Sequence, residues 1–481
     1  MIMRRLIHPF HSAFYAFAIV SSVLLLQVVS SQEVSTNLWT SNIAAQPTAV
    51  HYSKTEDLLY AFGHNPARVV SLNPNDGSIV EAVELPASTT SSSSSFGVIR
   101  HVVVRESKFR MDFAILNVDE GVGSGRIICW DFYNRLVRWE FDAGSMSLPT
   151  VGKPALSDDG TQVFQHFKDG EIYALNAYSG EVLWQKKFFP MAGWTYVNGQ
   201  LYGGIVAEIG GNPISPGIYH VDANTGTYQN RWRAPHRCYT SGSMNIFSQS
   251  SAGTHDNCNN IWTNSIASRS GEYLYVMDDY FGLMKFDTAN IAAGPIWTNS
   301  FSIDNAQGSQ QSYYPPVLSS DGSTVYASAY WTTAAIDTDD GSLLWTASQS
   351  GEWLTRDLVL SRPFGDALYA PYNFAIHKID TITGIVELET DKALLNTMVV
   401  QSSKRDKDRF FAAGVNVHAF STDLAPTVSP APVAAALEAP SPPLVIVGLQ
   451  DMNTSSAGVA TQLNSAILLL LLPSTLFYLL L

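Results

Sequence analysis

Few side chains in this sequence have the spacing of catalytic or metal-binding groups. The three cysteines are Cys129, Cys238 and Cys258, and no two of them are adjacent. His255 lies three residues before Cys258, but one such pair without other close ligands is a poor zinc signal. The sequence has no G-x-S-x-G nucleophile elbow, H-E-x-x-H helix, Walker A loop or dinucleotide fingerprint. We therefore expect no metal site and no catalytic residues.

Acidic turns are candidate calcium sites, because loops rich in oxygen ligands bind calcium. The clearest example is Asp337-Thr338-Asp339-Asp340-Gly341. Asp and Asn side chains also close turns by accepting hydrogen bonds from backbone N–H groups. Because this stretch falls where the repeat described below needs such a turn, a structural role is favoured over calcium binding.

A recurring hairpin pattern organises the middle of the chain. It consists of an apolar strand, an Asp or Asn, a turn that often contains Gly, and a second strand that ends in Trp; the clearest copies span residues 172–184 and 335–345. Each copy has one anchor residue at its turn. The anchors are Asn73, Asp131, Asn176, Asp222, Asp287, Asp337 and Asp380, followed by the half copy Val417–Ser421. Successive anchors are 58, 45, 46, 65, 50, 43 and 41 residues apart.

Two more candidate strands precede each anchor, as in residues 153–164 and 316–326, so each unit holds four strands. Such units, of about 40 to 50 residues, are typical of propeller blades, because one blade buries both faces only when neighbours cover them. The last copy lacks its Trp strand, and Asn37-Leu38-Trp39-Thr40 supplies one. We predict an all-β fold, an eight-bladed β-propeller of four-stranded antiparallel blades whose N- and C-terminal strands share the closing blade, with seven blades as the alternative.

The repeats resemble the pyrrolo-quinoline quinone (PQQ)-like repeat, the A-x-D-x-x-T-G-x-x-x-W pattern of quinoprotein alcohol dehydrogenases and related propellers. The matching residues are Ala174, Asn176, Gly180 and Trp184 in one copy and Ala335, Asp337, Gly341 and Trp345 in another. The resemblance covers about residues 37–423. The departures are Glu81 and Leu388 at the Trp positions of the first and seventh units, and the Gly-poor turn 288–293 of the fifth.

The resemblance implies the fold more specifically than an activity, because many members are noncatalytic scaffolds. Quinone-dependent members use an adjacent Cys–Cys pair at the cofactor, a bound calcium and an Asp base. Since this chain has no adjacent cysteines, we expect a noncatalytic binding or scaffold module for a glycan or a protein, with no cofactor. The alternative is an oxidoreductase for alcohols or sugars with a degenerate site, which would need PQQ and calcium.

Aromatic residues outside the repeat positions are the candidate ligand contacts. In a four-stranded blade, the interblade connection and the loop between the second and third strands emerge on the same face of the ring. The aromatic residues expected there are Trp194, Trp262 and Trp353 in interblade connections and Trp331, Tyr280 and Tyr372 in second-to-third-strand turns. Such a cluster could stack on sugars or dock a protein. The alternative is that these rings fill the channel and support its loops.

Composition and charge narrow the class of protein. The chain has 481 residues, 46% of them hydrophobic, and 28 Lys+Arg against 42 Asp+Glu, a formal net charge of −14. These values exclude a disordered chain, a disulfide miniprotein and a nucleic-acid binder. The acidic balance favours solubility and indicates no particular ligand.

Residues 1–31 have the order of a secretory signal peptide. Arg4 and Arg5 precede an apolar run that ends near Val29, and the small residues Ser30 and Ser31 follow. We predict cleavage after Ser31, which leaves a propeller domain at 32–423. The alternative is an uncleaved signal anchor, because about 17 apolar residues nearly span a bilayer.

The secretory route favours disulfide formation. Cys238 and Cys258 lie in the longest unit, of 65 residues, and are predicted to be bridged. Cys129 belongs to an apolar strand and is predicted to stay free.

The C-terminal segment has the order of a membrane-anchoring signal. Residues 424–455 are rich in Pro, Ala and Ser and should form an extended stalk. Small residues, a polar spacer and an apolar run from Ala466 to Leu481 follow, which is the order of a glycosylphosphatidylinositol (GPI) signal. We predict that residues 456–481 are removed. A retained tail anchor is the alternative, although no basic residue follows Arg409 to hold it.

Ser455 is the predicted attachment residue, with Asn453 and Ser456 as neighbouring alternatives. Asn453 also begins the chain's only N-glycosylation sequon and is a predicted glycan site. Together these signals predict a glycoprotein on the outer face of the plasma membrane, held there by a lipid.

Overall fold

The computed structural model describes residues 33–35, 37–64, 66–86, 98–108, 110–119, 125–142, 153–167, 170–188, 191–205, 217–234, 265–278, 282–301, 314–329, 332–348, 357–361, 367–372, 375–390, 395–400, 409–414 and 416–421. All of them belong to the first of two compact units, Met1–Pro426 and Thr427–Leu481.

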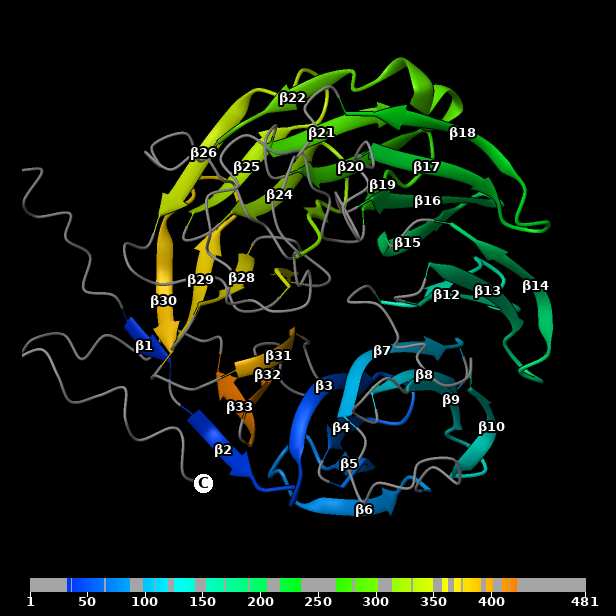
Figure 1. Cartoon of the computed structure of the whole chain (residues 1–481). Helices are drawn as coiled ribbons and strands as arrows, with labels where there is room; N and C mark the ends of the chain where they lie inside the picture. The colour runs from blue at the N-terminus through cyan, green and yellow to red at the C-terminus, as the bar shows by residue number, and fades with distance from the viewer. Residues whose placement is uncertain are drawn as a thin grey trace, which may run out of the picture. The chain divides into compact units, whose positions relative to one another are not determined.

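Eight four-stranded antiparallel sheets form a ring, so this unit is an eight-bladed β-propeller (Figure 1), which confirms the predicted fold class. Blade 1 holds β3 (Gln46–Ser53), β4 (Leu58–His64), β5 (Arg68–Leu72) and β6 (Ile79–Glu84). Blade 2 holds β7 (Val98–Glu106), β8 (Met111–Asp119), β9 (Gly125–Asp131) and β10 (Leu136–Asp142). Blade 3 holds β11 (Ala155–Leu156), β12 (Gln162–His166), β13 (Glu171–Asn176) and β14 (Val182–Lys187). Blade 4 holds β15 (Met191–Val197), β16 (Gln200–Ile205), β17 (Gly217–Asp222) and β18 (Tyr228–Arg233).

The second half of the ring repeats this order. Blade 5 holds β19 (Ile266–Ala267), β20 (Tyr273–Asp278), β21 (Gly282–Asp287) and β22 (Trp297–Asn299), with the 3-10 segment η1 (Thr288–Ala293) before β22. Blade 6 holds β23 (Val317–Leu318), β24 (Thr324–Ala329), β25 (Thr332–Asp337) and β26 (Leu343–Ser348). Blade 7 holds β27 (Val359–Leu360), β28 (Ala367–Pro371), β29 (Ile376–Asp380) and β30 (Val386–Thr390).

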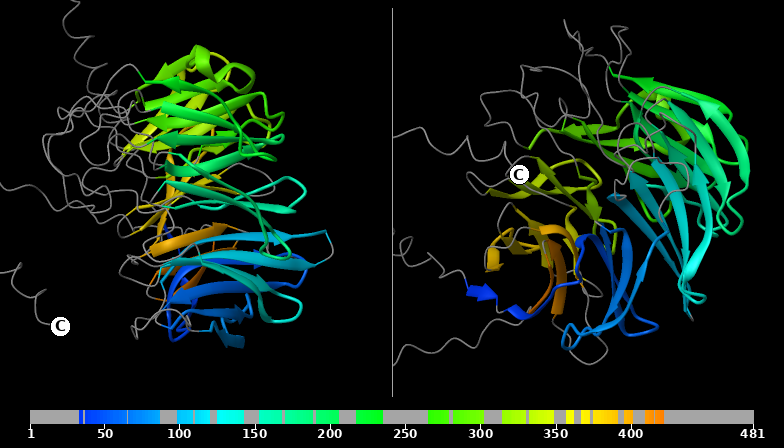
Figure 2. Two further views of the ribbon diagram at one scale, coloured as in Figure 1. Left: turned by 45° about the vertical axis from the view of Figure 1, so that its right-hand side comes forward. Right: turned by 60° about the horizontal axis from the view of Figure 1, so that its bottom comes forward.

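Strands from both ends of the propeller domain close the ring. Blade 8 combines β31 (Leu395–Val400), β32 (Arg409–Gly414) and β33 (Val417–Ser421) with the N-terminal strand β2 (Asn37–Ser41), in which Trp39 pairs with Ala419. The predicted shared blade is therefore confirmed, and Figure 2 shows the blue N-terminal strands beside the orange C-terminal ones. A further strand, β1 (Glu33–Ser35), pairs in parallel with β30 as a fifth strand of blade 7.

Hydrophobic cores lie between the blades rather than within them. Eight buried clusters each combine side chains of two consecutive blades. The cluster that joins the ends of the ring packs Phe411 and Val417 of blade 8 against Tyr52 and Leu59 of blade 1. Because burying one such side chain contributes about 1.5–3 kcal/mol, each blade depends on both neighbours for its stability.

The repeat tryptophan of one blade packs on a turn of the next blade. Trp139 donates its indole N–H to the carbonyl oxygen of Ala177 at 2.9 Å, and a Cβ built on Gly180 would lie 2.8 Å from the Trp139 ring. We call this arrangement the tryptophan–glycine contact. It recurs at four other interfaces, with Trp39 on Gly77, Trp184 on Gly226, Trp297 on Gly341 and Trp345 on Gly384.

Acidic and amide side chains hold these turns in shape. Asn176 Oδ1 accepts the backbone N–H groups of Tyr178 and Ser179 at 2.9 and 3.1 Å. Asp337 Oδ1 accepts the N–H of Asp339 at 2.7 Å. The acidic turn at 337–341 therefore has the structural role that the sequence predicts.

A β-bulge precedes the tryptophan position in seven of the eight blades. In blade 3, for example, Val182 pairs with Leu175 and Trp184 with Ala174, so Leu183 has no partner of its own. The extra residue bends the outermost strand and re-aims the tryptophan toward the next blade.

Gly341→Ala should destabilise the protein more than Gly322→Ala in the same blade. The two glycines have φ of +76° and +79°, so both alanines carry the same left-handed strain, about 1–2 kcal/mol. A Cβ at residue 341 would also lie 2.6 Å from the Trp297 ring, whereas nothing lies within 4 Å at residue 322. Urea unfolding should show about 1–3 kcal/mol of extra loss for Gly341→Ala. Equal losses would contradict the tryptophan–glycine contact.

Candidate binding surface

Two of the six predicted ligand-contact residues are described by the structure, and both are core side chains. Trp194 is 1% exposed, and its ring centroid lies 6.0 Å from that of Phe188. Tyr372 is also 1% exposed, and its hydroxyl oxygen lies 2.8 Å from that of Thr333. Both side chains pack between blades, which agrees with the alternative that these rings have a structural role, and their ligand role stays a prediction. The other four, Trp262, Trp331, Trp353 and Tyr280, lie outside the described residues.

Cys129 is unbridged and buried, as predicted. Burial raises the pKa of its thiol to about 12, so the reactive thiolate is scarce at neutral pH. The predicted disulfide residues Cys238 and Cys258 and the predicted modification sites Asn453 and Ser455 lie outside the described residues, as do residues 1–31 and 424–481.

In the described parts of the chain, no group of three or more His, Cys, Asp or Glu side chains is arranged to hold a metal ion. No helix in those parts is both long and apolar enough to cross a membrane.

The interface between blades 1 and 2 replaces the tryptophan–glycine contact with an ion pair. Glu81 occupies the tryptophan position of β6, and Arg135 occupies the glycine position in the turn after β9. Glu81 Oε2 lies 2.5 Å from Arg135 Nη1. Arg135 has a φ of 55°, so it keeps the left-handed conformation that glycine adopts in the other turns.

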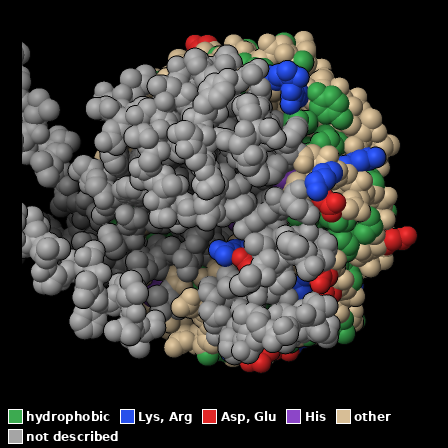
Figure 3. Space-filling model, in the orientation of Figure 1, with side chains coloured by type: hydrophobic (Ala, Val, Ile, Leu, Met, Phe, Trp, Pro, Cys, Tyr) green, Lys and Arg blue, Asp and Glu red, His purple; other side chains and the backbone are tan. Residues whose placement is uncertain are grey.

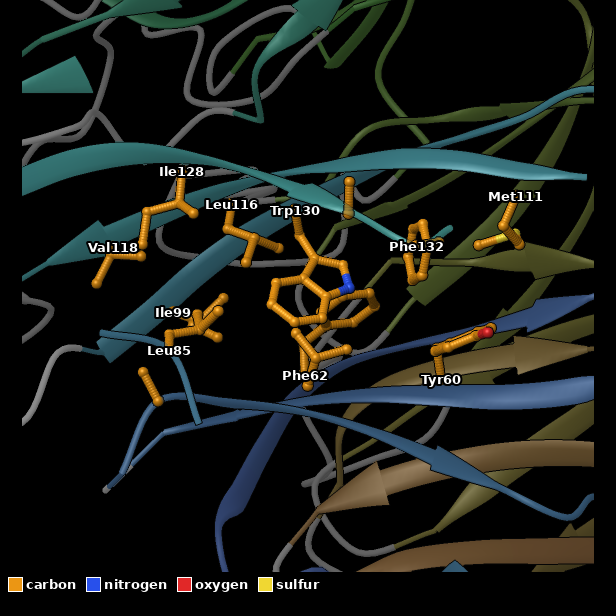
Figure 4. Close-up of a cluster of buried hydrophobic side chains, with 13 residues drawn as sticks. Tyr60, Phe62, Leu85, Ile99, Met111, Leu116, Val118, Ile128, Trp130 and Phe132 are labelled. Carbon is orange, nitrogen blue, oxygen red and sulfur yellow. The ribbon is translucent and has the colours of Figure 1, made fainter. Parts of the chain in front are cut away.

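Aromatic side chains of blade 2 fill the space that the missing tryptophan leaves. Phe132 follows Asp131, and its ring centroid lies 4.7 Å from that of Tyr60 and 6.4 Å from that of Phe62, both in blade 1. Figure 4 shows Phe132 and Trp130 facing blade 1 within this cluster. The equivalent residues in turns that receive a tryptophan are smaller: Pro74, Ala177, Ala223, Thr338 and Thr381. Blade 2 therefore supplies the aromatic bulk that blade 1 lacks.

Large apolar side chains are exposed at one region of the repeat, on or beside the outermost strand near the turn between the third and fourth strands. They are Leu38, Ile79, Val80, Tyr133, Leu136, Tyr178, Val182, Leu183, Tyr228, Ile296, Leu343, Leu344, Ile382 and Ile385. Figure 3 shows hydrophobic side chains along the right-hand rim of the face that it draws. The rim of the propeller is thus partly apolar.

Tyrosine and arginine join this apolar rim on blades 2 and 3. Tyr133, at the tip of the turn after β9, is 74% exposed, and the guanidinium carbon of Arg110 lies 5.5 Å from its ring centroid. Arg110 belongs to the turn between β7 and β8, which emerges on the same face of the ring as the turn after β9. Tyr178 is the equivalent tip residue of blade 3 and is also exposed. We call Arg110, Tyr133, Arg135, Leu136 and Tyr178 the Tyr–Arg surface.

The buried side chain of Asp131 holds the turn of this surface in shape through hydrogen bonds. Its carboxylate accepts the backbone N–H of Asn134 at 2.9 Å and two hydrogen bonds from Arg138, at 3.0 and 2.6 Å. Burial opposes ionisation, but these donors outweigh it and hold the pKa of Asp131 below its ordinary value. The Arg138 guanidinium also lies 5.6 Å from the Tyr178 ring centroid, so it links the turns of blades 2 and 3.

Comparison with known proteins agrees with the geometry. A family model described as outer membrane protein assembly factor BamB matches residues 29–186 and 216–427. The chain belongs to this family. Among solved structures, BamB from Moraxella catarrhalis is 16% identical, with a TM-score of 0.55 over 81% of this chain and 100% of its own.

Two other solved propellers resemble this BamB-family chain. The C-terminal WD40 domain of Sif2 is 10% identical, with a TM-score of 0.58 over 81% of this chain and 99% of that one. The computationally designed Ika8 protein is 11% identical, with a TM-score of 0.55 over 81% of this chain and 100% of that one. At these identities the likeness shows the fold alone. No curated protein matches the sequence.

The sequence alone did not identify the Tyr–Arg surface in this BamB-family propeller. Glu81 was visible as a departure from the repeat. The signal that could have found the surface is the second departure, Arg135 at the glycine position of the following unit. Comparing each tryptophan position with the glycine position of the next unit would have predicted the contact between Glu81 and Arg135.

Phe132→Ala should lower the free energy of unfolding by about 3–5 kcal/mol, because it empties the core between blades 1 and 2. The neighbouring variant Tyr133→Ala should cost less than about 1 kcal/mol, because Tyr133 is exposed. Adding Glu81→Trp and Arg135→Gly to Phe132→Ala should restore much of the loss by rebuilding the tryptophan–glycine contact. A further loss on that addition, measured by urea unfolding, would contradict the replacement described above.

His377 should make the propeller sensitive to acid. Its side chain is buried with its ring centroid 4.8 Å from that of Tyr372, and burial lowers its pKa to about 4. In the unfolded chain the His377 imidazole has its ordinary pKa of about 6.5, so between pH 6.5 and 4 the folded state binds fewer protons than the unfolded state does. The free energy of unfolding therefore falls as the pH falls through that window, by about 3 kcal/mol in total. His377→Gln should flatten this part of the stability–pH curve. An unchanged slope would contradict the assignment.

Proposed function

We propose that this chain is a noncatalytic scaffold on the outer face of the cell, where it binds another protein. The observation that carries the proposal is the Tyr–Arg surface, in which Tyr133 and Leu136 are exposed beside two arginines. Tyr, Arg and large apolar side chains are enriched at the energetically important centres of protein interfaces. Membership of a propeller family that contains an assembly factor agrees with a binding role.

A protein ligand fits this surface better than a glycan does. Exposed rings can stack on sugars, but this surface also exposes the aliphatic side chain of Leu136, and Ile79 and Val80 are exposed on β6, the strand whose Glu81 pairs with Arg135. The predicted signal peptide and GPI signal support the extracellular location and the lipid anchor.

Site-specific photo-crosslinking on intact cells would test the proposal. The full chain would carry a photoreactive amino acid either at position 133 or at position 339, the exposed tip of the equivalent turn in blade 6. We expect position 133, and not position 339, to yield a discrete protein adduct that excess unlabelled chain suppresses. The same adducts at both positions, or an adduct removed by glycosidases, would contradict a protein partner at this surface. Saturable oxidation of alcohols or sugars after addition of PQQ and calcium would contradict the noncatalytic assignment.

A further inference from the structure

We propose that the partner segment bound at the Tyr–Arg surface is acidic, an extended peptide stretch in which carboxylate and apolar side chains alternate. This inference rests on the proposed protein-binding function and adds the chemistry of the partner. Three observations carry it: the exposure of the arginines, the free nitrogen atoms on them, and the charge of the rest of the chain.

The arginines are the exposed members of their ion pairs. The side chain of Arg110 is 61% exposed and that of its partner Asp112 is 15% exposed. The side chain of Arg135 is 58% exposed and that of Glu81 is 35% exposed. In both ion pairs the guanidinium group is therefore more exposed to solvent than the carboxylate that pairs with it.

Each arginine keeps two adjacent nitrogen atoms free for a carboxylate. Arg110 contacts Asp112 through Nε at 3.3 Å, so its Nη1 and Nη2 have no partner among the described residues. Arg135 contacts Glu81 through Nη1, so within the same part of the chain its Nε and Nη2 are unpaired. Both pairs of nitrogen atoms have the fork geometry that binds a carboxylate with two parallel hydrogen bonds.

The arginines are also held in position before a partner arrives. Arg110 lies against the Tyr133 ring, and Arg135 is fixed by Glu81 at the interface of blades 1 and 2. Side chains already restrained in this way lose less conformational entropy on binding than free arginines do.

Leu136 follows Arg135 directly and is exposed, so an apolar side chain of the partner can pack beside the carboxylate that Arg135 binds. The chain as a whole has a formal net charge of −14, which repels an acidic partner elsewhere on its surface. An acidic segment is therefore directed to this cluster of arginines by attraction and kept from other sites by repulsion.

Fluorescence anisotropy with the full chain purified in detergent would test the inference. The probe is a labelled 12-residue peptide of alternating Glu and Leu, and its matched control replaces every Glu with Gln. We expect the Glu peptide to bind at least tenfold more tightly than the Gln peptide, with an affinity that falls as salt rises. Arg110→Gln with Arg135→Gln should weaken Glu-peptide binding at least tenfold.

Arg100→Gln is the matched control, because Arg100 is 56% exposed and paired with Asp119 on the same blade. It lies near the start of β7, at the opposite end of the blade from the turn that carries Arg110. We expect this variant to bind like the unmodified chain. Tyr133→Glu keeps both arginines and adds a repelling charge, so it should also lose binding even if the double arginine variant folds poorly.

Equal binding of the Glu and Gln peptides, or an equal loss with Arg100→Gln, would overturn the inference. Binding of heparin that needs Arg110 and Arg135, without binding of the Glu peptide, would overturn it in favour of a sulfated glycan. If position 133 crosslinks a protein on cells while the Glu peptide does not bind, the proposed protein-binding function stands and the acidic chemistry of the partner is wrong.

Discussion

The tryptophan that five of the eight blades place on the turn of the next blade is the contact that recurs most often around the ring. It needs a glycine, because the turn is left-handed there and because a Cβ would enter the ring, as at Gly341 under Trp297. In four of the five contacts a bulge before the tryptophan turns the side chain toward the neighbour, whereas β22, which carries Trp297, pairs without a bulge and follows η1. The contact also needs a side chain that closes the turn, such as Asp337. The repeat motif therefore joins two neighbouring blades, because the tryptophan of one copy packs on the glycine of the following copy.

Departures from the repeat are matched across the interfaces where they occur. Glu81 faces Arg135, and Phe132 restores the lost aromatic bulk from the other side. Trp232 is retained, but η1 lengthens the turn of blade 5 so that Gly294 lies beside its indole nitrogen. At Leu388, in the seventh tryptophan position, the next blade has no continuous turn to receive a tryptophan, because its fourth strand comes from the N-terminus. The strand β1 pairs there instead.

The sequence was sufficient to predict the eight blades, because an anchor residue recurs every 41 to 65 residues. It was also sufficient to predict the closing strand, because the segment around Trp39 matches the strand that the last copy lacks. It did not predict β1, since the pairing of residues 33–35 with 388–390 leaves no local pattern. Trp194 was assigned to a connection, but β15 begins three residues earlier and carries it into the core. The Tyr–Arg surface also needed the fold, because Arg110 and Tyr133 come from separate turns and Tyr178 from another blade.

A repeated architecture in which the turns between blades 1 and 2 are altered offers a simple route to a binding site, because these turns can change while the tryptophan–glycine contacts at five other interfaces hold the ring. Side-chain footprinting by hydroxyl radicals, on the full chain in intact cells and after purification, tests whether this surface is occupied. Tyr133 and Tyr178 should be oxidised less on cells than in the purified chain, while Ile382, the exposed tip residue of blade 7, should be oxidised equally in both. Equal oxidation of Tyr133 in the two samples would contradict the claim that the Tyr–Arg surface binds a partner.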